Sequence, residues 1–204
     1  MKLTPVARWL WIHLQLFIPS FSLVGILTTL FPEMMLSAFG KWALVMQAVG
    51  ARSASQFSSQ PEMFMHILTT NAVSLVIFVI VGLFLQAALA MPFTAAFYAL
   101  VAFLAPYTIG RSFGPADWLL ISVESFTLIL GASVSSGLAA DLYGVSPSFR
   151  GLVEYWKKSW TKLLPRLVPH WREIVREWRV TIAAAVVSLA ALSVFVAWFE
   201  MYGY

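Results

Sequence analysis

The chain has 204 residues, of which 60% are hydrophobic and 11% are charged, and it contains no cysteine. These values are typical of a polytopic membrane protein and exclude an ordinary soluble domain. The lack of cysteine excludes disulfides, thiolate catalysis and cysteine-ligated metal centres. The net charge of +4 comes mostly from one loop, so it indicates membrane topology and lipid contact and no binding of nucleic acid.

The sequence predicts an all-α fold, a single membrane domain of about five transmembrane helices accompanied by interfacial amphipathic helices. Each of its five apolar segments is close to the roughly 20 residues that a helix needs to cross the bilayer core. The predicted spans cover residues 10–31, 71–90, 93–109, 118–140 and 180–199.

The first span follows Lys2 and Arg8 and contains Pro19, which predicts a kink. Its apolar run is longer than the roughly 7 to 15 residues of a signal-peptide core and no clear cleavage site follows, so we predict a retained span. An outer segment, 33–60, comes next. Polar residues are scattered through its first half, which suits a helix lying in the interface or a short re-entrant one. Pro61 then begins a helix that runs on into the second span.

The second span opens on Asn71 and has Gln86 as its other strongly polar residue. Met91 and Pro92 predict a very tight connection to the third span. Turn residues fill the loop that follows, and Asp117 stands in the first turn of the next helix, where an acid favours the positive end of the helix dipole.

The fourth span carries one ionisable residue, Glu124, and a carboxylate inside a membrane is expensive. Beyond Glu124 the helix carries small residues on every side. Their small-xxx-small spacings predict close backbone packing at the centre of the bundle. The predicted packing residues are Gly131, Ser133, Ser135 and Gly137.

A basic amphipathic loop covers residues 142–179, in which tryptophans are interleaved with charges and Pro165 and Pro169 separate two helices. This pattern is typical of helices that place their rings at headgroup depth, where they contact lipid, and a docking site for a cytoplasmic partner is the alternative. The contact residues are Lys157, Lys158, Lys162, Arg166, Arg172, Arg176, Arg179, Trp156, Trp160, Trp171 and Trp178.

Five spans with a cytoplasmic amino terminus place ten of the 13 Lys and Arg residues inside and three outside. This distribution follows the positive-inside rule. We therefore expect a multi-pass protein of the cell membrane with its carboxyl terminus outside. In that orientation Glu124, Asn71 and Glu200 all lie in the outer half of the bilayer, where they can form one cluster.

Three roles are open for Glu124. It can pair with Asn71 or a polar group of the first span in a contact that fixes helix packing, it can form a proton or cation site, or it can contact a partner protein. His13, His66 and His170 are too scattered for a metal site. The sequence shows no nucleophile with its base and no phosphate-binding loop, so it predicts no enzyme and no cofactor.

Asn71, a small-residue fourth span with Glu124, a basic loop, and Glu200 between aromatic residues together resemble the stage II sporulation protein M family over residues 66–204. Members usually carry Pro-His-Gly-x-x-Glu in the corresponding span. This chain reads Leu-Ile-Ser-Val-Glu at residues 120–124, so it keeps the glutamate and lacks the proline, histidine and glycine. The resemblance implies a non-enzymatic polytopic membrane protein that works with partners. In sporulating members the role is to anchor peptidoglycan-remodelling hydrolases at the membrane.

The sequence thus favours a scaffold or accessory subunit of a membrane complex, in contact with lipids and with other membrane subunits or copies of itself. The alternative is a small-solute or ion transporter or channel component that works as an oligomer through Glu124. An intramembrane enzyme lacks any supporting motif.

Overall fold

The computed structural model describes residues 2–48, 59–157 and 171–202, and these residues form seven helices and no strand. The predicted all-α fold class is confirmed. The helices are α1 (Leu3–Leu30), α2 (Pro32–Ala48), α3 (Gln60–Leu83), α4 (Ala87–Thr108), α5 (Pro115–Tyr143), α6 (Phe149–Lys157) and α8 (Trp171–Tyr202).

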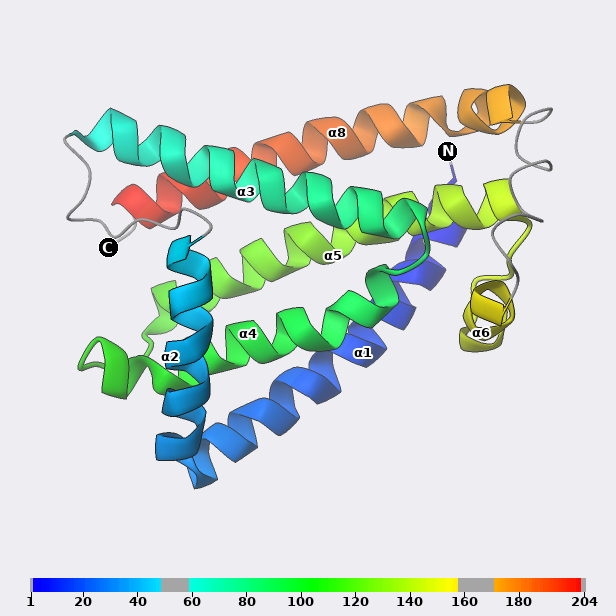
Figure 1. The fold of residues 1–204 in the computed structure, drawn as a ribbon. Helices are drawn as coiled ribbons and strands as arrows, with labels where there is room; N and C mark the ends of the chain where they lie inside the picture. The colour runs from blue at the N-terminus through cyan, green and yellow to red at the C-terminus, as the bar shows by residue number, and fades with distance from the viewer. Residues whose placement is uncertain (1, 49–58, 158–170, 203–204) are drawn as a thin grey trace.

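Five of these helices, α1, α3, α4, α5 and α8, are long and apolar enough to cross a membrane. The predicted number of spans is therefore confirmed and fits a multi-pass membrane protein. The five helices run back and forth along the long dimension of the bundle, so the amino and carboxyl termini lie at opposite ends (Figure 1). We call the end that holds the amino terminus, the turn between α3 and α4, and α6 the amino-terminal end.

Helix α5 is the centre of the bundle, since α1, α3, α4 and α8 all pack against it. Of the five candidate spans it is the most buried and α3 is the least buried. Its sequence explains this position, because small side chains on every side let neighbouring helices approach its backbone.

Helix α2 begins directly after α1, at Pro32, and runs across the end of the bundle rather than along it (Figure 1). It packs against α1 and α4. This arrangement suits the interfacial alternative predicted for segment 33–60. The last part of that segment, residues 49–58, lies outside the described residues.

Helix α3 begins at Gln60, eleven residues before the predicted start of the second span at Asn71. The side chain of Ser59 caps it by accepting a hydrogen bond from the backbone N–H of Glu62, and Pro61 stands in its first turn. The helix started by Pro61 therefore does continue into the span, as the sequence indicated. Asn71 consequently lies in the middle of α3 and does not open it.

The connection between the second and third spans is at residues 84–86, and the prediction of a turn at Met91 and Pro92 is wrong. Leu85 adopts a left-handed conformation with φ +54°, and the N–H groups of Leu85 and Gln86 bond back to Gly82 and Val81. This pair of bonds is a Schellman motif, which normally ends in glycine. Pro92 instead lies inside α4, and Gln86 lies in the turn and not within a span.

Leu85 provides a test of this turn, because its side chain is buried while its backbone has the conformation that favours glycine. We expect Leu85→Gly and Leu85→Ala both to destabilise the protein, with the glycine variant about 1 kcal/mol the more stable of the two. Leu104 is equally buried but helical, so Leu104→Gly should be less stable than Leu104→Ala. Thermal unfolding in detergent micelles measures both orders. The same order at both positions would contradict the turn.

Hydrogen bonds that cap the helix define both ends of α5. Asp117 accepts a hydrogen bond from the Gly114 N–H at 2.8 Å and holds Arg111 through two bonds of 2.6 and 3.0 Å. At its other end Gly144 has φ +64°, and Val145 donates to the Ala140 carbonyl. The helix therefore extends a few residues past each end of the predicted span 118–140.

Helix α8 is continuous from Trp171 to Tyr202, so residues 171–179 of the predicted loop 142–179 belong to the same helix as the last span. The loop's first helix is α6, whose apolar side packs Leu152 and Tyr155 against the bundle. Residues 158–170, which include Pro165 and Pro169, lie outside the described residues.

Candidate functional site

Helices α3, α5 and α8 line a small cavity of about 20 Å³. This volume is just above the roughly 10 to 15 Å³ that one water molecule requires. Five of the seven lining residues carry a side-chain oxygen, which is unusual for the interior of an apolar bundle. The lining residues are Asn71, Ser74, Glu124, Thr127, Leu128, Ser193 and Val196.

Glu124 reaches this cavity from α5 and also hydrogen-bonds to the hydroxyl of Tyr98 on α4. Tyr98 is itself buried. The partner expected from the sequence was Asn71 or a polar group of the first span, and the structure gives a tyrosine of the third span instead. A tyrosine in an apolar helix is normally interpreted as a core residue. Only the packing of α4 on α5 identifies Tyr98 as a partner of Glu124.

Asn71 and Glu200 complete the cluster from α3 and α8. Glu200 is near enough to Asn71 and to Glu124 to interact with both electrostatically. The buried Nδ2 of Asn71 makes no hydrogen bond within the described residues. The structure therefore brings together three of the four predicted intramembrane polar residues. Gln86 is not among them, since it lies in the turn at the amino-terminal end (Figure 1).

The four predicted packing residues of α5 are all buried, and they face three different helices. A Cβ added to Gly131 would meet Leu75 of α3 at 2.6 Å, and one added to Gly137 would meet Trp178 of α8 at 2.8 Å. Ser135 lies against Gly82 of α3. Each of these contacts requires a small residue on α5.

Ser133 contacts α1 through His13, which is fully buried. Its hydroxyl donates to the Ile129 carbonyl at 2.6 Å and lies 2.9 Å from His13 Nδ1. Because the single hydroxyl proton is used by Ile129, His13 Nδ1 must be the donor in the second bond. The contact thus places a proton on His13 Nδ1 and joins α1 to α5.

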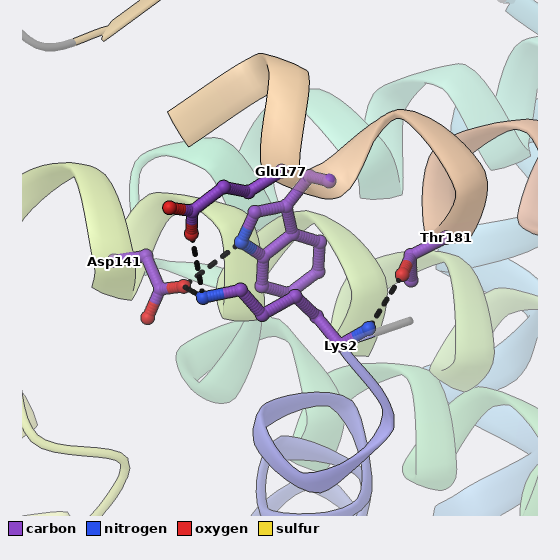
Figure 2. A network of polar contacts seen from close by, with 5 residues as sticks. Lys2, Asp141, Glu177 and Thr181 are labelled. Atoms are coloured by element: carbon purple, nitrogen blue, oxygen red, sulfur yellow. Dashed lines mark hydrogen bonds and ion pairs between the residues drawn. The ribbon is translucent and has the colours of Figure 1, made fainter. Parts of the chain in front are cut away.

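At the amino-terminal end, Lys2 connects the start of the chain to α5 and α8 (Figure 2). Its ammonium lies 2.9 Å from Glu177 and 3.5 Å from Asp141, and its backbone N–H donates to Thr181 at 2.8 Å. The hydrogen bond to Glu177 raises the pKa of the Lys2 ammonium above its ordinary value. The first residues and the start of α8 therefore lie at the same end of the bundle.

Trp178 belongs to this network and not to a lipid-facing surface, so the contact predicted for it is wrong. It is fully buried, it packs on Gly137, and its indole N–H donates to the Asp141 carboxylate at 2.8 Å. The reason is the position of Trp178 around the axis of the helix. As part of α8, Trp178 faces α5, whereas Arg176 and Arg179 on the same turn are exposed.

The other described residues of the predicted contact set lie on the outside of the protein. Trp156, Lys157, Trp171 and the arginines of α8 are exposed, and the guanidinium of Arg172 lies 5.6 Å from the Trp171 ring. The remaining four predicted contacts fall outside the described residues, namely Lys158, Trp160, Lys162 and Arg166.

Comparisons of the chain with protein-family models, with curated proteins and with solved structures find no match. The site is therefore defined by its own geometry. It is a water-sized cavity inside an apolar bundle, with Asn71 and Glu124 on its wall and with Tyr98 and Glu200 next to Glu124.

Proposed function

We propose that the chain is a non-enzymatic integral membrane protein that acts as a scaffold or accessory subunit of a larger membrane complex. The observation that carries this proposal is a regular stripe on the exposed face of α8. Valines and alanines alternate along it at spacings of three and four residues: Val180, Ala183, Val187, Ala190 and Val194.

This spacing is that of the seam along which two helices pack, and alanine at every second position lets another backbone approach closely. Contact with lipid does not require such a pattern, since any apolar side chain can face lipid. The exposed face of α3 provides the contrast, because it carries bulkier residues such as Ile77 and Ile80. The stripe therefore suits a helix of another subunit or of a second copy of this chain.

The proposal places the protein in the cell membrane with its amino terminus in the cytoplasm and its carboxyl terminus outside. Support comes from the grouping of basic residues. Lys2, α6 with Lys157, and the arginines at the start of α8 lie at one end of the bundle. Positive charge gathered at one end is typical of the cytoplasmic side.

A second candidate, a transporter or channel component, is favoured by the ionisable Glu124 on the wall of the cavity. Ionisable residues inside a membrane commonly mark ion or proton pathways. The cavity of this chain holds about one water, so a pathway would require an oligomer. Asn71 and Glu124 line this cavity and Glu200 interacts with both of them. These three residues carry the resemblance to the stage II sporulation protein M family, and that family's reliance on partners supports the subunit proposal.

The test is gentle detergent purification of the tagged full-length protein, with co-migrating chains identified and their stoichiometry measured. We expect one partner chain at fixed stoichiometry. Ala183→Leu with Ala190→Leu should release it, because leucine keeps the helices apart. The matched control is Ala72→Leu on the exposed face of α3, which should retain the partner. A partner that survives the double substitution, or a lone chain without partners, would contradict the proposal.

A further inference from the structure

We propose that a groove between α6 and the outer face of α4 binds one anionic phospholipid, with an acyl chain along α4 and the headgroup beside the basic residues of α6. Three features carry this inference: the apolar lining of the groove, its length along α4, and the charge at its mouth.

The groove begins where α6 meets α1 and the first turn of α4, at the amino-terminal end of the bundle (Figure 1). Leu152 and Tyr155 of α6 pack there against Trp9 of α1 and Ala88 of α4. The next stripe of α6 lines one side of a cavity of about 430 Å³. This stripe is 38 to 45% exposed and consists of Phe149, Val153 and Trp156.

The lining of this cavity indicates a hydrocarbon ligand. Its volume lies within the roughly 300 to 1,000 Å³ of small-molecule sites, but such sites normally include a few polar groups that orient the ligand. The nine residues that line this cavity are apolar, and Trp156 alone among them carries a polar side-chain atom. The wall formed by α4 belongs to a candidate span, and its Phe93 is 79% exposed. An acyl chain of the surrounding membrane therefore matches the lining.

The groove continues along α4 for a distance that suits one acyl chain. A second cavity, of about 200 Å³, shares Phe93 with the first and extends to Leu100. The helix rises about 16 Å from Leu89 to Leu100, at roughly 1.5 Å per residue. One leaflet is half of the roughly 30 Å hydrocarbon core, or about 15 Å. The two cavities together therefore run from the end of the bundle to about the middle of the membrane.

The sequence of α4 builds this groove from two neighbouring rows of residues at four-residue spacing. Such rows form the ridges of a helix surface, so a low row beside a high row makes a channel. The low row contains compact residues, namely Ala88, Pro92 and Ala96. The high row contains large residues, namely Leu89, Phe93 and Phe97. Leu100 follows Ala96 in the low row and closes the channel.

The charge beside the groove decides the class of lipid. Arg150 directly follows Phe149 of the lining, and Lys157 directly follows Trp156. Arg150 pairs with Glu154 at 3.0 Å, so α6 keeps one net positive charge. A tryptophan next to a basic residue is typical of headgroup depth. An anionic headgroup neutralises this charge, whereas a zwitterionic headgroup has no net charge to offer.

A lipid that binds the folded state raises its stability, so the site is detectable without a partner protein. The experiment is thermal unfolding of the purified full-length chain in detergent micelles, with dioleoyl phosphatidylglycerol or dioleoyl phosphatidylcholine added stepwise. Native mass spectrometry counts the retained lipids. We expect a saturating rise of the unfolding midpoint and one phosphatidylglycerol per chain. Phosphatidylcholine should bind about fivefold more weakly, the effect of about one charge. Glycerol 3-phosphate, which has the charge but no chain, should give no rise.

Two variants test the two parts of the site. Phe93→Ala removes the wall that both cavities share and should weaken the binding of both lipids about tenfold. Because Phe93 is exposed, this variant should fold, and Phe126→Ala at an exposed position of α5 is the matched control that should bind normally. Lys157→Gln should remove the preference for phosphatidylglycerol and keep the binding of phosphatidylcholine.

Equal binding of the two lipids by the native chain would overturn the proposal, and so would phosphatidylglycerol binding that neither Phe93→Ala nor Lys157→Gln changes. A native chain that retains no lipid would also overturn it, and would leave a helix of another protein as the occupant of the groove. These results do not depend on the stripe of α8, so the failure of one proposal is distinguishable from the failure of the other.

Discussion

The Trp178→Ala variant is expected to lose about 3 to 5 kcal/mol of stability, the usual effect of truncating a fully buried tryptophan. Trp178 has no exposed surface and packs against Gly137, where α5 and α8 approach most closely at this end of the bundle. Removal of the ring opens a cavity that two helices held by Lys2 cannot close. It also takes the indole donor away from Asp141.

Trp178→Phe separates the two contributions, because it removes the indole N–H while it keeps an aromatic ring. We expect a loss of about 1.5 to 3 kcal/mol, the usual value of a hydrogen bond to a charged group. The matched control is Trp171→Ala on the same helix, where the ring is 46% exposed and the expected loss is about 1 kcal/mol or less. Unfolding in detergent measures all three. Equal losses for Trp171→Ala and Trp178→Ala would contradict the burial of Trp178.

Gly82→Ala is the second substitution with a large expected effect, and we expect it to cost about 1 to 3 kcal/mol. An alanine Cβ there would overlap the Ser135 hydroxyl and lie 2.9 Å from the Ala132 carbonyl oxygen. The hydroxyl is held by bonds to Gly131 and Ala132, so it cannot rotate away without loss. The backbone oxygen cannot move unless α3 and α5 separate.

A second substitution across the interface tests this explanation. Ser135→Gly removes the overlapping side chain, so Gly82→Ala with Ser135→Gly should be more stable than the sum of the two single changes predicts. The control is Gly40→Ala on α2, where an added Cβ meets no atom within 4 Å and the expected effect is neutral or stabilising. Additive losses in the double variant would show that α3 and α5 do not touch at this point.

The sequence predicted the class of fold and the number of spans because both depend on long apolar runs, which are strong signals. The position of the second turn could not be predicted. It rests on Leu85, a residue type that almost never signals a left-handed helix end, while Met91 and Pro92 resemble a break. Only the burial of the Leu85 side chain explains why a leucine occupies this position.

The candidate site was partly predictable for a similar reason. Glu124 and Asn71 stand out in apolar surroundings, so their residue types alone marked them. Tyr98 could not be predicted as the partner of Glu124, since its role depends on the packing of α4. Trp178 was misplaced because an interleaved pattern of aromatic and charged residues does not reveal which face of the helix meets α5.

The central claim is that α5 packs backbone to backbone against its neighbours and thereby encloses Glu124. The native chain has no cysteine, so a disulfide between Gly82→Cys and Ser135→Cys tests the claim directly in membranes. A Cβ at Gly82 lies 3.1 Å from that of Ser135, close to the roughly 3.5 to 4.5 Å of a disulfide. We predict rapid and nearly complete cross-linking on mild oxidation, and none for the control pair Val76→Cys with Ser135→Cys, in which Val76 is 55% exposed. Equal cross-linking of the two pairs, or none in either, would contradict the account.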